Sequence, residues 1–373
     1  MKVLAWGTYD LSKPRVRILM RALESSGVTL QKCHVDVWDA VADKSQIRGA
    51  LAKLRLALNW LLAYPKLIWC LLRSPKPDVI FVGYLGQFDV LILWPFAKLR
   101  GIPIAWDAFI SLYNTVVEDR RMVGKRNPLA LLLYAVEWLA CRAADRVILD
   151  TRAHADYFVE RFGVATEKTA AVFVGAEMEN FVVKPVQRDP AQPYTVLFYG
   201  QFIPLHGIPT IIEAARLLKN EPIDWVVIGK GQEEKRIAQM LDQHPLPRLQ
   251  WIPWVKYEEL VDHIARADVC LGIFDDGCKA SRVIPNKVFQ IIASSKPLIT
   301  RDSPAMRELV ADEIPEIAFV EAANPDQLAQ AVLAMQTGEP AGTDWHTPLA
   351  RRFGIESLKR DLIDCLPFKT RRV

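Results

Sequence analysis

A short stretch in the second half of the chain carries the residue types that hold anionic ligands. Pro285 and Asn286 predict the start of a helix, where the next backbone amides have no partner within the helix. These amides, the helix dipole and the Lys287 ammonium together form an anion site. Gln290, one turn further along, can offer its amide to the vicinal hydroxyls of a ribose. This spacing suits a nucleotide. From these residues alone, a helix that begins here without binding a ligand is an equally good interpretation.

Glycines at the ends of predicted strands extend the candidate site. Gly200 and Gly207 enclose a loop that contains His206, and glycine lets backbone amides approach a phosphate closely. His206 can hydrogen-bond a phosphate or a sugar hydroxyl, although a lone histidine is more often structural. Lys230 and Gly231 belong to a second glycine turn, which is either part of the site or only a turn.

Aromatic and acidic residues lie near other strand ends of the same half. Trp254 and Val255 end a predicted strand, where an indole could flank a nucleotide base; Trp251 and Trp254 could equally be core residues. Asp275 and Asp276 form a pair of carboxylates without metal-ligand partners in suitable spacing, so we expect a solvated loop. We expect no metal site.

The order of predicted elements indicates two domains. Short apolar runs typical of strands alternate with helical patterns throughout, which predicts an α/β fold with two doubly wound, Rossmann-like parallel sheets. We expect an acceptor-side domain at residues 1–185, a second domain at residues 194–352 and a proline-rich linker between them. Residues 353–373 hold a final helix. Two such domains leave a cleft at the carboxyl ends of their strands, where these folds bind ligands.

Composition sets the broad class of the protein. Of the 373 residues, 51% are apolar and 24% are charged, which is ordinary for a soluble globular protein. The six cysteines lack zinc-ligand spacing and are expected to be reduced thiols of a cytoplasmic protein. Residues 1–185 carry 25 Lys and Arg against 18 Asp and Glu, and the remainder carries 22 against 25, so the first half is the better candidate for an anionic partner. No nucleic-acid-binding motif is present, so we expect no nucleic-acid partner.

Four stretches of the second domain follow one another in a recognisable order: FYGQFIPLHGIPTIIEAARLL (198–218), WVVIGKGQEEKRIAQM (225–240), LQWIPWVKYEELVDHIARADVCLGIF (249–274) and SRVIPNKVFQIIASSKPLIT (281–300). With these stretches the domain resembles the family 4 glycosyltransferases of the GT-B fold. The resemblance implies transfer of a sugar from a nucleotide donor, usually with retention and without a bound metal, with the donor on the second domain and the last helix returning to the first.

The family pattern is altered at its charged positions. Gln201 and His206 stand where the family usually has Arg and Lys on the diphosphate, and Arg282 and Gln290 stand where it usually has two glutamates. Lys279, Arg282 and Lys287 still supply positive charge for a diphosphate. This makes the chain a divergent member that lacks the usual acidic pair. The donor-binding residues implied are Gly200, Gln201, His206, Gly207, Lys230, Gly231, Trp254, Val255, Lys279, Asn286, Lys287 and Gln290.

In the first domain, the stretch AWDAFISLYNT (105–115) occupies the strand end where family members often carry a catalytic histidine. Asp107 in this stretch could act as the base for an acceptor hydroxyl, or it could merely cap the next turn. We predict Asp107 and Arg282 as catalytic residues. Gly7, Arg15 and Ser111 are predicted on the acceptor side.

These observations predict a retaining, metal-independent hexosyltransferase with no cofactor. Its donor would be a UDP- or GDP-linked sugar, and its acceptor a glycan or a lipid-linked molecule in polysaccharide or glycolipid biosynthesis. Two alternatives stay open: a nucleotide-sugar epimerase or hydrolase of the same fold, and a non-catalytic sensor of sugar nucleotides.

One basic stretch suggests a membrane partner. Lys44 to Pro77 contains seven Lys or Arg and no acidic residue, and Leu51, Leu54, Leu58 and Leu61 recur at helical spacing. Such a helix could lie on an anionic membrane surface, which would place the protein on the inner face of the membrane. An ordinary sheet-covering helix with a solvated basic side is the alternative. Pro65 and Lys66 interrupt the apolar run before the ~20 residues that a bilayer requires.

Overall fold

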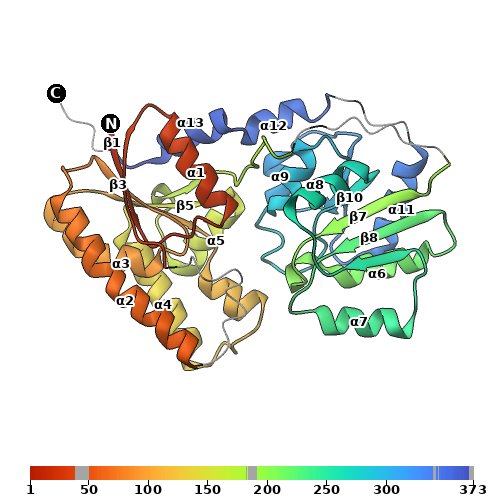
Figure 1. The fold of residues 1–373 in the computed structure, drawn as a ribbon, viewed down its shortest axis with the longest axis horizontal. Helices are drawn as coiled ribbons and strands as arrows, with labels where there is room; N and C mark the ends of the chain where they lie inside the picture. Colours follow the sequence, from red (N-terminus) through yellow and green to blue (C-terminus); the bar gives the residue numbers. More distant parts are fainter. Residues whose placement is uncertain (38–49, 182, 184–190, 339–341, 343, 369–373) are drawn as a thin grey trace. The chain divides into compact units, whose positions relative to one another are not determined.

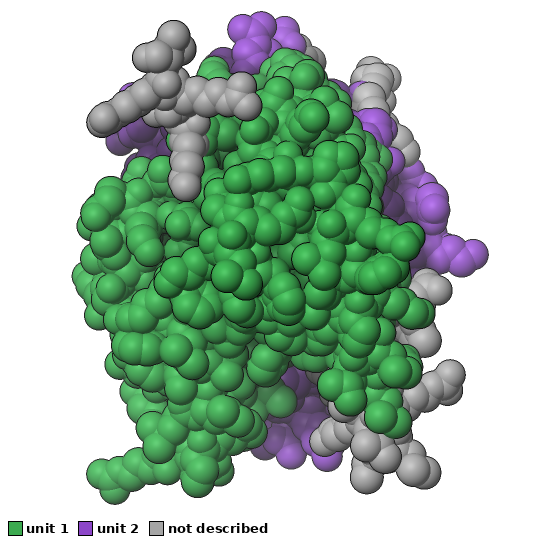
Figure 2. Space-filling view, turned by 90° about the vertical axis from the view of Figure 1, so that its left-hand side faces the viewer, with its two compact units in different colours: residues 1–173, 355–373 green, residues 174–354 purple. Residues whose placement is uncertain are grey.

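The computed structural model describes residues 1–37, 50–181, 183, 191–338, 342 and 344–368, and of residues 50–57 it describes the backbone alone. The chain divides into two compact units, which Figure 2 colours separately. Unit 1 comprises Met1–Phe173 and Ile355–Val373, and unit 2 comprises Val174–Gly354. The boundary between them therefore precedes the predicted domain end at residue 185.

Unit 1 contains a six-stranded parallel sheet in the order β2-β1-β3-β4-β5-β6. Its strands are β1 (Lys2–Gly7), β2 (Thr29–His34), β3 (Val79–Val82), β4 (Ile104–Phe109), β5 (Arg146–Leu149) and β6 (Thr169–Ala171). Its helices are α1 (Pro14–Ser25), α2 (Ala50–Arg73), α3 (Gln87–Arg100), α4 (Pro128–Ala143), α5 (Arg152–Phe162) and α13 (Ile355–Cys365), with a π-helical turn at Asn114–Asp119 and a 3-10 turn at Thr166–Lys168.

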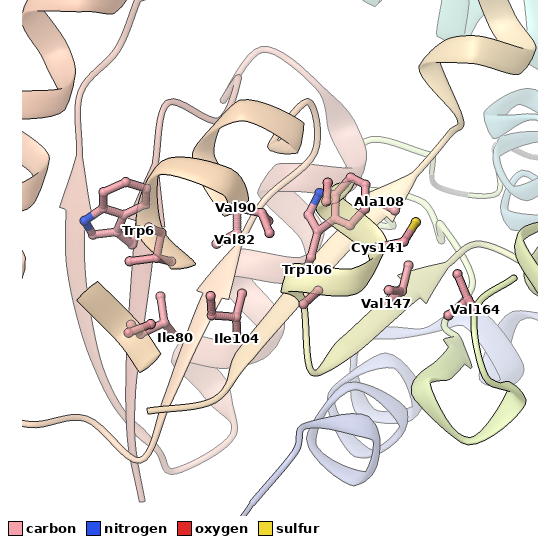
Figure 3. Packing of buried hydrophobic residues seen from close by; sticks show 14 of the residues in the cluster. Trp6, Ile80, Val82, Val90, Ile104, Trp106, Ala108, Cys141, Val147 and Val164 are labelled. Atoms are coloured by element: carbon pink, nitrogen blue, oxygen red, sulfur yellow. The ribbon is translucent and has the colours of Figure 1, made fainter. Parts of the chain in front are cut away.

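Helices cover both faces of this sheet, as the alternation of its side chains requires. On one face Trp106 of β4 packs with side chains from α2, α3, α4 and α5, and on the other Ala105 packs with residues of α1 and α13. Figure 3 shows Ile80 and Val82 of β3 beside Ile104 and Trp106 of β4 on the first face. The helix after the last strand, α13, packs on α1 through Leu358 and Leu362.

Unit 2 contains a second six-stranded parallel sheet, in the order β12-β11-β10-β7-β8-β9. Its strands are β7 (Tyr194–Tyr199), β8 (Ile223–Ile228), β9 (Leu249–Ile252), β10 (Val269–Leu271), β11 (Leu298–Arg301) and β12 (Ile317–Val320). Its helices are α6 (Ile208–Leu217), α7 (Glu234–Gln243), α8 (Tyr257–Arg266), α9 (Asn286–Ala293), α10 (Pro304–Leu309), α11 (Pro325–Thr337) and α12 (Thr347–Phe353), with a 3-10 turn at Pro204–His206 (Figure 1).

The predicted α/β class with two parallel sheets is confirmed, and one expectation about the cysteines is not. Cys33 and Cys70 form a disulfide, so the expectation of reduced thiols is wrong for this pair. Helix α2 continues through Pro65 to Arg73, because the lost hydrogen bond of one proline does not outweigh the packing of the surrounding turns. No helix among the described residues is long and apolar enough to cross a membrane.

Candidate functional site

The strand order of unit 2 identifies where a ligand would bind. After β7 the chain turns into α6, which lies on one side, and the neighbouring strand β10 leads through a long loop into α9. Ligands of doubly wound sheets bind at such a switch point, beyond the carboxyl ends of the strands. The two loops meet here, because the Phe274 amide donates to the His206 carbonyl at 3.1 Å. Gly207 fits this meeting point, since an added Cβ would lie 2.5 Å from the Asp275 nitrogen.

Lys287, in the first turn of α9, carries a buried ammonium without a hydrogen-bond partner in the described part of the chain. Its side chain is 5% exposed, and its Nζ lies 3.8 Å from the centroid of the Phe198 ring. Desolvation by burial lowers the pKa of Lys287 well below its ordinary value of 10.5. A buried cation without a counterion is costly, so an anion from outside the protein would be stabilised beside Lys287.

Gly200, the first residue after β7, leaves space beside this ammonium. A Cβ at Gly200 would lie 3.0 Å from both the Lys287 Nζ and the His206 Cε1. The two groups therefore line the same space, and any side chain at position 200 would crowd them. His206 is held in place because its Nδ1 pairs with the Gln201 carbonyl oxygen.

Gly200→Ala is expected to destabilise unit 2 by about 1–3 kcal/mol, because the backbone φ is +146° and the added methyl collides with Lys287 and His206. Gly27→Ala is a matched control: its φ is +75° but no atom lies within 4 Å of the added Cβ, so it should cost only about 1 kcal/mol. Chemical denaturation of both variants measures the difference. Equal losses would mean that the space beside Gly200 is not constrained.

The beginning of α9 adds donors to the same site. Pro285 precedes the helix without a side-chain cap, and the described structure shows no hydrogen bond from the Asn286 and Lys287 amides. The Gln290 side-chain oxygen accepts from the Tyr199 hydroxyl at 3.1 Å, which leaves its amide nitrogen to donate outward. The α9 stretch of the sequence prediction thus lies beside Gly200 and His206.

The loop before α9 brings further cations. Lys279 is buried, and Arg282 is half-buried four residues before the helix. Arg301, at the end of β11, holds this loop by donating to the Asp275 and Gly277 carbonyls, and burial lowers its pKa. Arg301 was not predicted as a site residue. Its position at the end of a strand is the only local signal that it lies near the site.

The glycine turn after β8 packs against the same region. A Cβ at Gly229 would lie 1.9 Å from the Gly200 carbonyl oxygen, and one at Gly231 would lie 2.8 Å from the Phe202 oxygen. Trp251 stacks on Phe202 and donates to the Gly229 carbonyl at 2.8 Å, which makes it a packing residue. The remaining predicted donor residues on this side, Gln201, Lys230 and Trp254, are exposed, and Val255 is half-buried.

The structure corrects the prediction that Asp107 is a catalytic base. Its carboxylate is 1% exposed and accepts from Arg15, whose Nη2 lies 2.7 Å from Oδ1 and whose Nε lies 3.1 Å from Oδ2. Arg15, also 1% exposed, further donates to the Val172 and Leu149 carbonyls. The sequence analysis placed Asp107 at a strand end, whereas β4 runs on to Phe109, so Asp107 lies inside the strand on the face that meets Arg15 of α1. Arg15 is therefore an internal ion-pair partner, not an acceptor-side residue.

The other acceptor-side candidates also face the interior of unit 1. Ser111 is fully buried and donates to Glu137 at 2.6 Å, and Glu137 also accepts from the amides of Leu112 and Tyr113. Gly7 leaves room for Asp89, whose Oδ2 would lie 2.3 Å from an added Cβ. Burial raises the pKa of Asp89 to about 6. The sequence did not predict that Asp89 and Glu137 would be buried. Carboxylates on predicted helices are normally expected to face solvent, and no residue nearby in the sequence identifies their partners.

Comparison with known proteins finds a family model that is similar to most of unit 2. Residues 193–337 match the family model described as glycosyl transferases group 1. A protein of Escherichia coli (strain K12), named as the colanic acid biosynthesis glycosyl transferase WcaI, is 24% identical over 248 residues. The match covers 64% of this chain and 60% of that protein, so the chain spans less than two thirds of this curated relative's length.

Solved structures share the fold over nearly the whole chain. Sucrose-phosphate synthase from Thermosynechococcus elongatus aligns with a TM-score of 0.70 and 15% identity, covering 97% of each chain. Anabaena Alr3699/HepE in complex with UDP and glucose aligns with a TM-score of 0.66 and 12% identity, covering 97% of this chain and 98% of that one. At these identities the likeness shows the fold, and it confirms the predicted two-domain GT-B architecture.

Proposed function

We propose that the protein is a glycosyltransferase that moves a sugar from a nucleotide-sugar donor to an acceptor, because residues 193–337 match the family model described as glycosyl transferases group 1. The donor would bind at the carboxyl edge of the unit 2 sheet, between the loops that follow β7 and β10. The observation that carries this proposal is the buried, unpartnered Lys287 ammonium beside Gly200.

A nucleoside diphosphate fits this site in both charge and spacing. Its phosphates would neutralise Lys287 and accept from the free amides at the start of α9. The Gln290 amide nitrogen, one helical turn on, would donate to a ribose hydroxyl. His206, on the other side of Gly200, would donate from Nε2 to a phosphate as an imidazolium, or accept from a hydroxyl of the donor sugar as a neutral imidazole.

These groups would also promote the reaction. When the bond between the sugar carbon and the terminal phosphate oxygen breaks, negative charge grows on the leaving nucleoside diphosphate. Lys287 and the α9 amides would face that position, so they would stabilise the charge without rearranging. Arg282, on the loop before α9, would add positive charge there.

The finer features belong to the proposal as well. We propose a UDP- or GDP-linked hexose as donor, a glycan or lipid-linked acceptor, and transfer with retention and without a metal or cofactor. The neighbour that binds UDP and glucose, and the relative named for colanic acid biosynthesis, support a nucleotide donor and a polysaccharide or glycolipid product. We further propose that the protein works in the cytoplasm, on the inner face of the membrane.

Turnover of a panel of nucleotide sugars, followed by release of the nucleoside diphosphate, tests the activity. Release that requires an added acceptor extract supports transfer. Release at the same rate without acceptor would indicate a hydrolase, and conversion of the sugar without release an epimerase. Binding of a nucleotide sugar with no turnover in any mixture would indicate a sensor.

Nucleotide binding is expected to take up protons, because a diphosphate beside Lys287 raises the pKa that burial has lowered. At pH values between the lowered pKa of the free protein and the raised pKa of the complex, up to about one proton enters per nucleotide. Calorimetric titration in buffers of different ionisation enthalpy measures this uptake. A binding heat that does not depend on the buffer would show that Lys287 does not meet the phosphates.

A further inference from the structure

The outer side of helices α2, α3 and α4 in unit 1 exposes large apolar side chains. We call this surface the α2–α4 face. On most solvated helices such residues face inward, whereas here they recur on three successive helices, and contiguous exposed apolar surface marks an interaction site. The most exposed members are Leu61, Leu62, Trp69, Leu99, Leu131 and Leu132.

The three helices form one continuous layer over the sheet, and Figure 1 shows them next to one another. Helices α2 and α3 are joined by the Tyr64 hydroxyl, which donates to Asp89 at 3.0 Å, and by the edge-to-face rings of Trp60 and Phe88. Arg100, in the last turn of α3, donates to the Ser74 carbonyl just after α2. Helices α3 and α4 pack directly together. The exposed side chains therefore belong to one surface.

The charge of this layer has a single sign at the surface. Asp89 and Glu137 are the only acidic residues in the sequences of the three helices, and both are buried. The exposed charged residues of the described side chains are cations, among them Lys66, Arg73 and Lys98.

Several of these cations pair with aromatic rings. The Arg73 guanidinium lies 4.2 Å from the centroid of the Trp69 ring, and the Lys98 ammonium lies 4.8 Å from that of Trp94. Tryptophan beside a basic side chain suits the boundary between lipid headgroups and acyl chains, where the ring meets the apolar layer and the cation meets phosphate.

We propose that the α2–α4 face binds the surface of an anionic lipid bilayer. Its apolar side chains would enter the headgroup boundary, and its cations would meet the lipid phosphates. A second copy of this chain fits less well. A two-fold interface would place this face against itself and bring cation against cation, with no exposed carboxylate on the three helices to pair with them.

Sedimentation with lipid vesicles tests the proposal on the full chain. Phosphatidylcholine vesicles are compared with vesicles that also contain phosphatidylglycerol, at low and high salt. We expect binding to the anionic vesicles that weakens with salt, since each basic side chain near the surface contributes separately. The paired substitutions Leu61→Asp with Leu62→Asp, and Lys66→Glu with Arg73→Glu, should each lower the partition coefficient at least about tenfold.

Leu217→Asp is the matched control, because Leu217 is an equally apolar, exposed helical residue of unit 2. It should bind vesicles as the wild type does, and the melting temperatures of all variants should stay close together. Failure of the wild type to bind anionic vesicles at low salt would overturn the proposal, as would unchanged binding by both double variants. A wild-type dimer in analytical ultracentrifugation that Leu61→Asp with Leu62→Asp converts to monomer would assign the face to a second copy instead.

Discussion

Asp107→Ala is expected to destabilise unit 1 by about 3–5 kcal/mol, because it leaves the Arg15 guanidinium buried without its counterion. Arg15 would keep its bonds to the Val172 and Leu149 carbonyls, but neutral acceptors do not offset a desolvated charge. Denaturant titration measures the loss. Asp364→Ala, which removes an exposed carboxylate from α13, should change the free energy of unfolding by no more than about 0.5 kcal/mol.

The same pair separates a structural role from a catalytic one. Replacing both partners, as Arg15→Met with Asp107→Leu, removes the buried charge altogether and should recover much of the stability lost by Asp107→Ala. We expect this double variant to retain turnover. A double variant that folds stably but has lost turnover while still binding the nucleotide would restore Asp107 as the catalytic base.

Lys287→Met is expected to weaken nucleoside diphosphate binding about a hundredfold, since it removes a buried cation that has no hydrogen-bond partner among the described residues. Without ligand, the same substitution should raise the stability of unit 2 by about 1–3 kcal/mol near neutral pH. The sign follows from the pKa of Lys287, which is lower in the folded state than in the unfolded state. Below the unfolded value, folding must therefore expel a proton or bury a charge, and methionine avoids both.

These opposite effects distinguish a ligand site from a structural lysine. Calorimetric titration gives the affinity, and denaturant titration gives the stability of the free variant. Lys296→Met is a matched control, because Lys296 is also partly buried but donates to the Ala267 carbonyl at 2.9 Å. It should lose stability and keep its affinity. A Lys287→Met protein that is less stable than the wild type, with unchanged affinity, would contradict the proposed donor site.

The sequence predicted the fold because local signals agree with it over both halves. Alternating strand and helix patterns are set by side chains within a few residues of each other, and parallel sheets follow from that order. The ends of strands were harder to predict: Asp107 was placed at a strand end, whereas β4 continues two residues beyond it, to Phe109. The partner of Asp107, Arg15, lies 92 positions away, and nothing in the local pattern relates the two.

The candidate site could likewise be predicted only where its signals are local in the sequence. The residues around α9 could be proposed from Pro285 and the spacing of Lys287 and Gln290, since a helix start is a local feature. That Lys287 would be buried against Phe198, and that Gly200 would leave space beside it, depends on the packing of β7 against α9. Similarly, the basic character of α2 was visible in the sequence, whereas its continuation onto α3 and α4 appears only when the helices are placed side by side.

The most direct test of the donor site is a thermal-shift screen of the purified protein against nucleoside diphosphates and their sugar conjugates. A ligand that binds only the folded protein raises its melting temperature by mass action. We expect a selective rise with the diphosphates of one base, which Lys287→Met abolishes. No rise with any nucleotide, in a protein that is otherwise folded, would contradict a nucleotide-sugar donor site in unit 2.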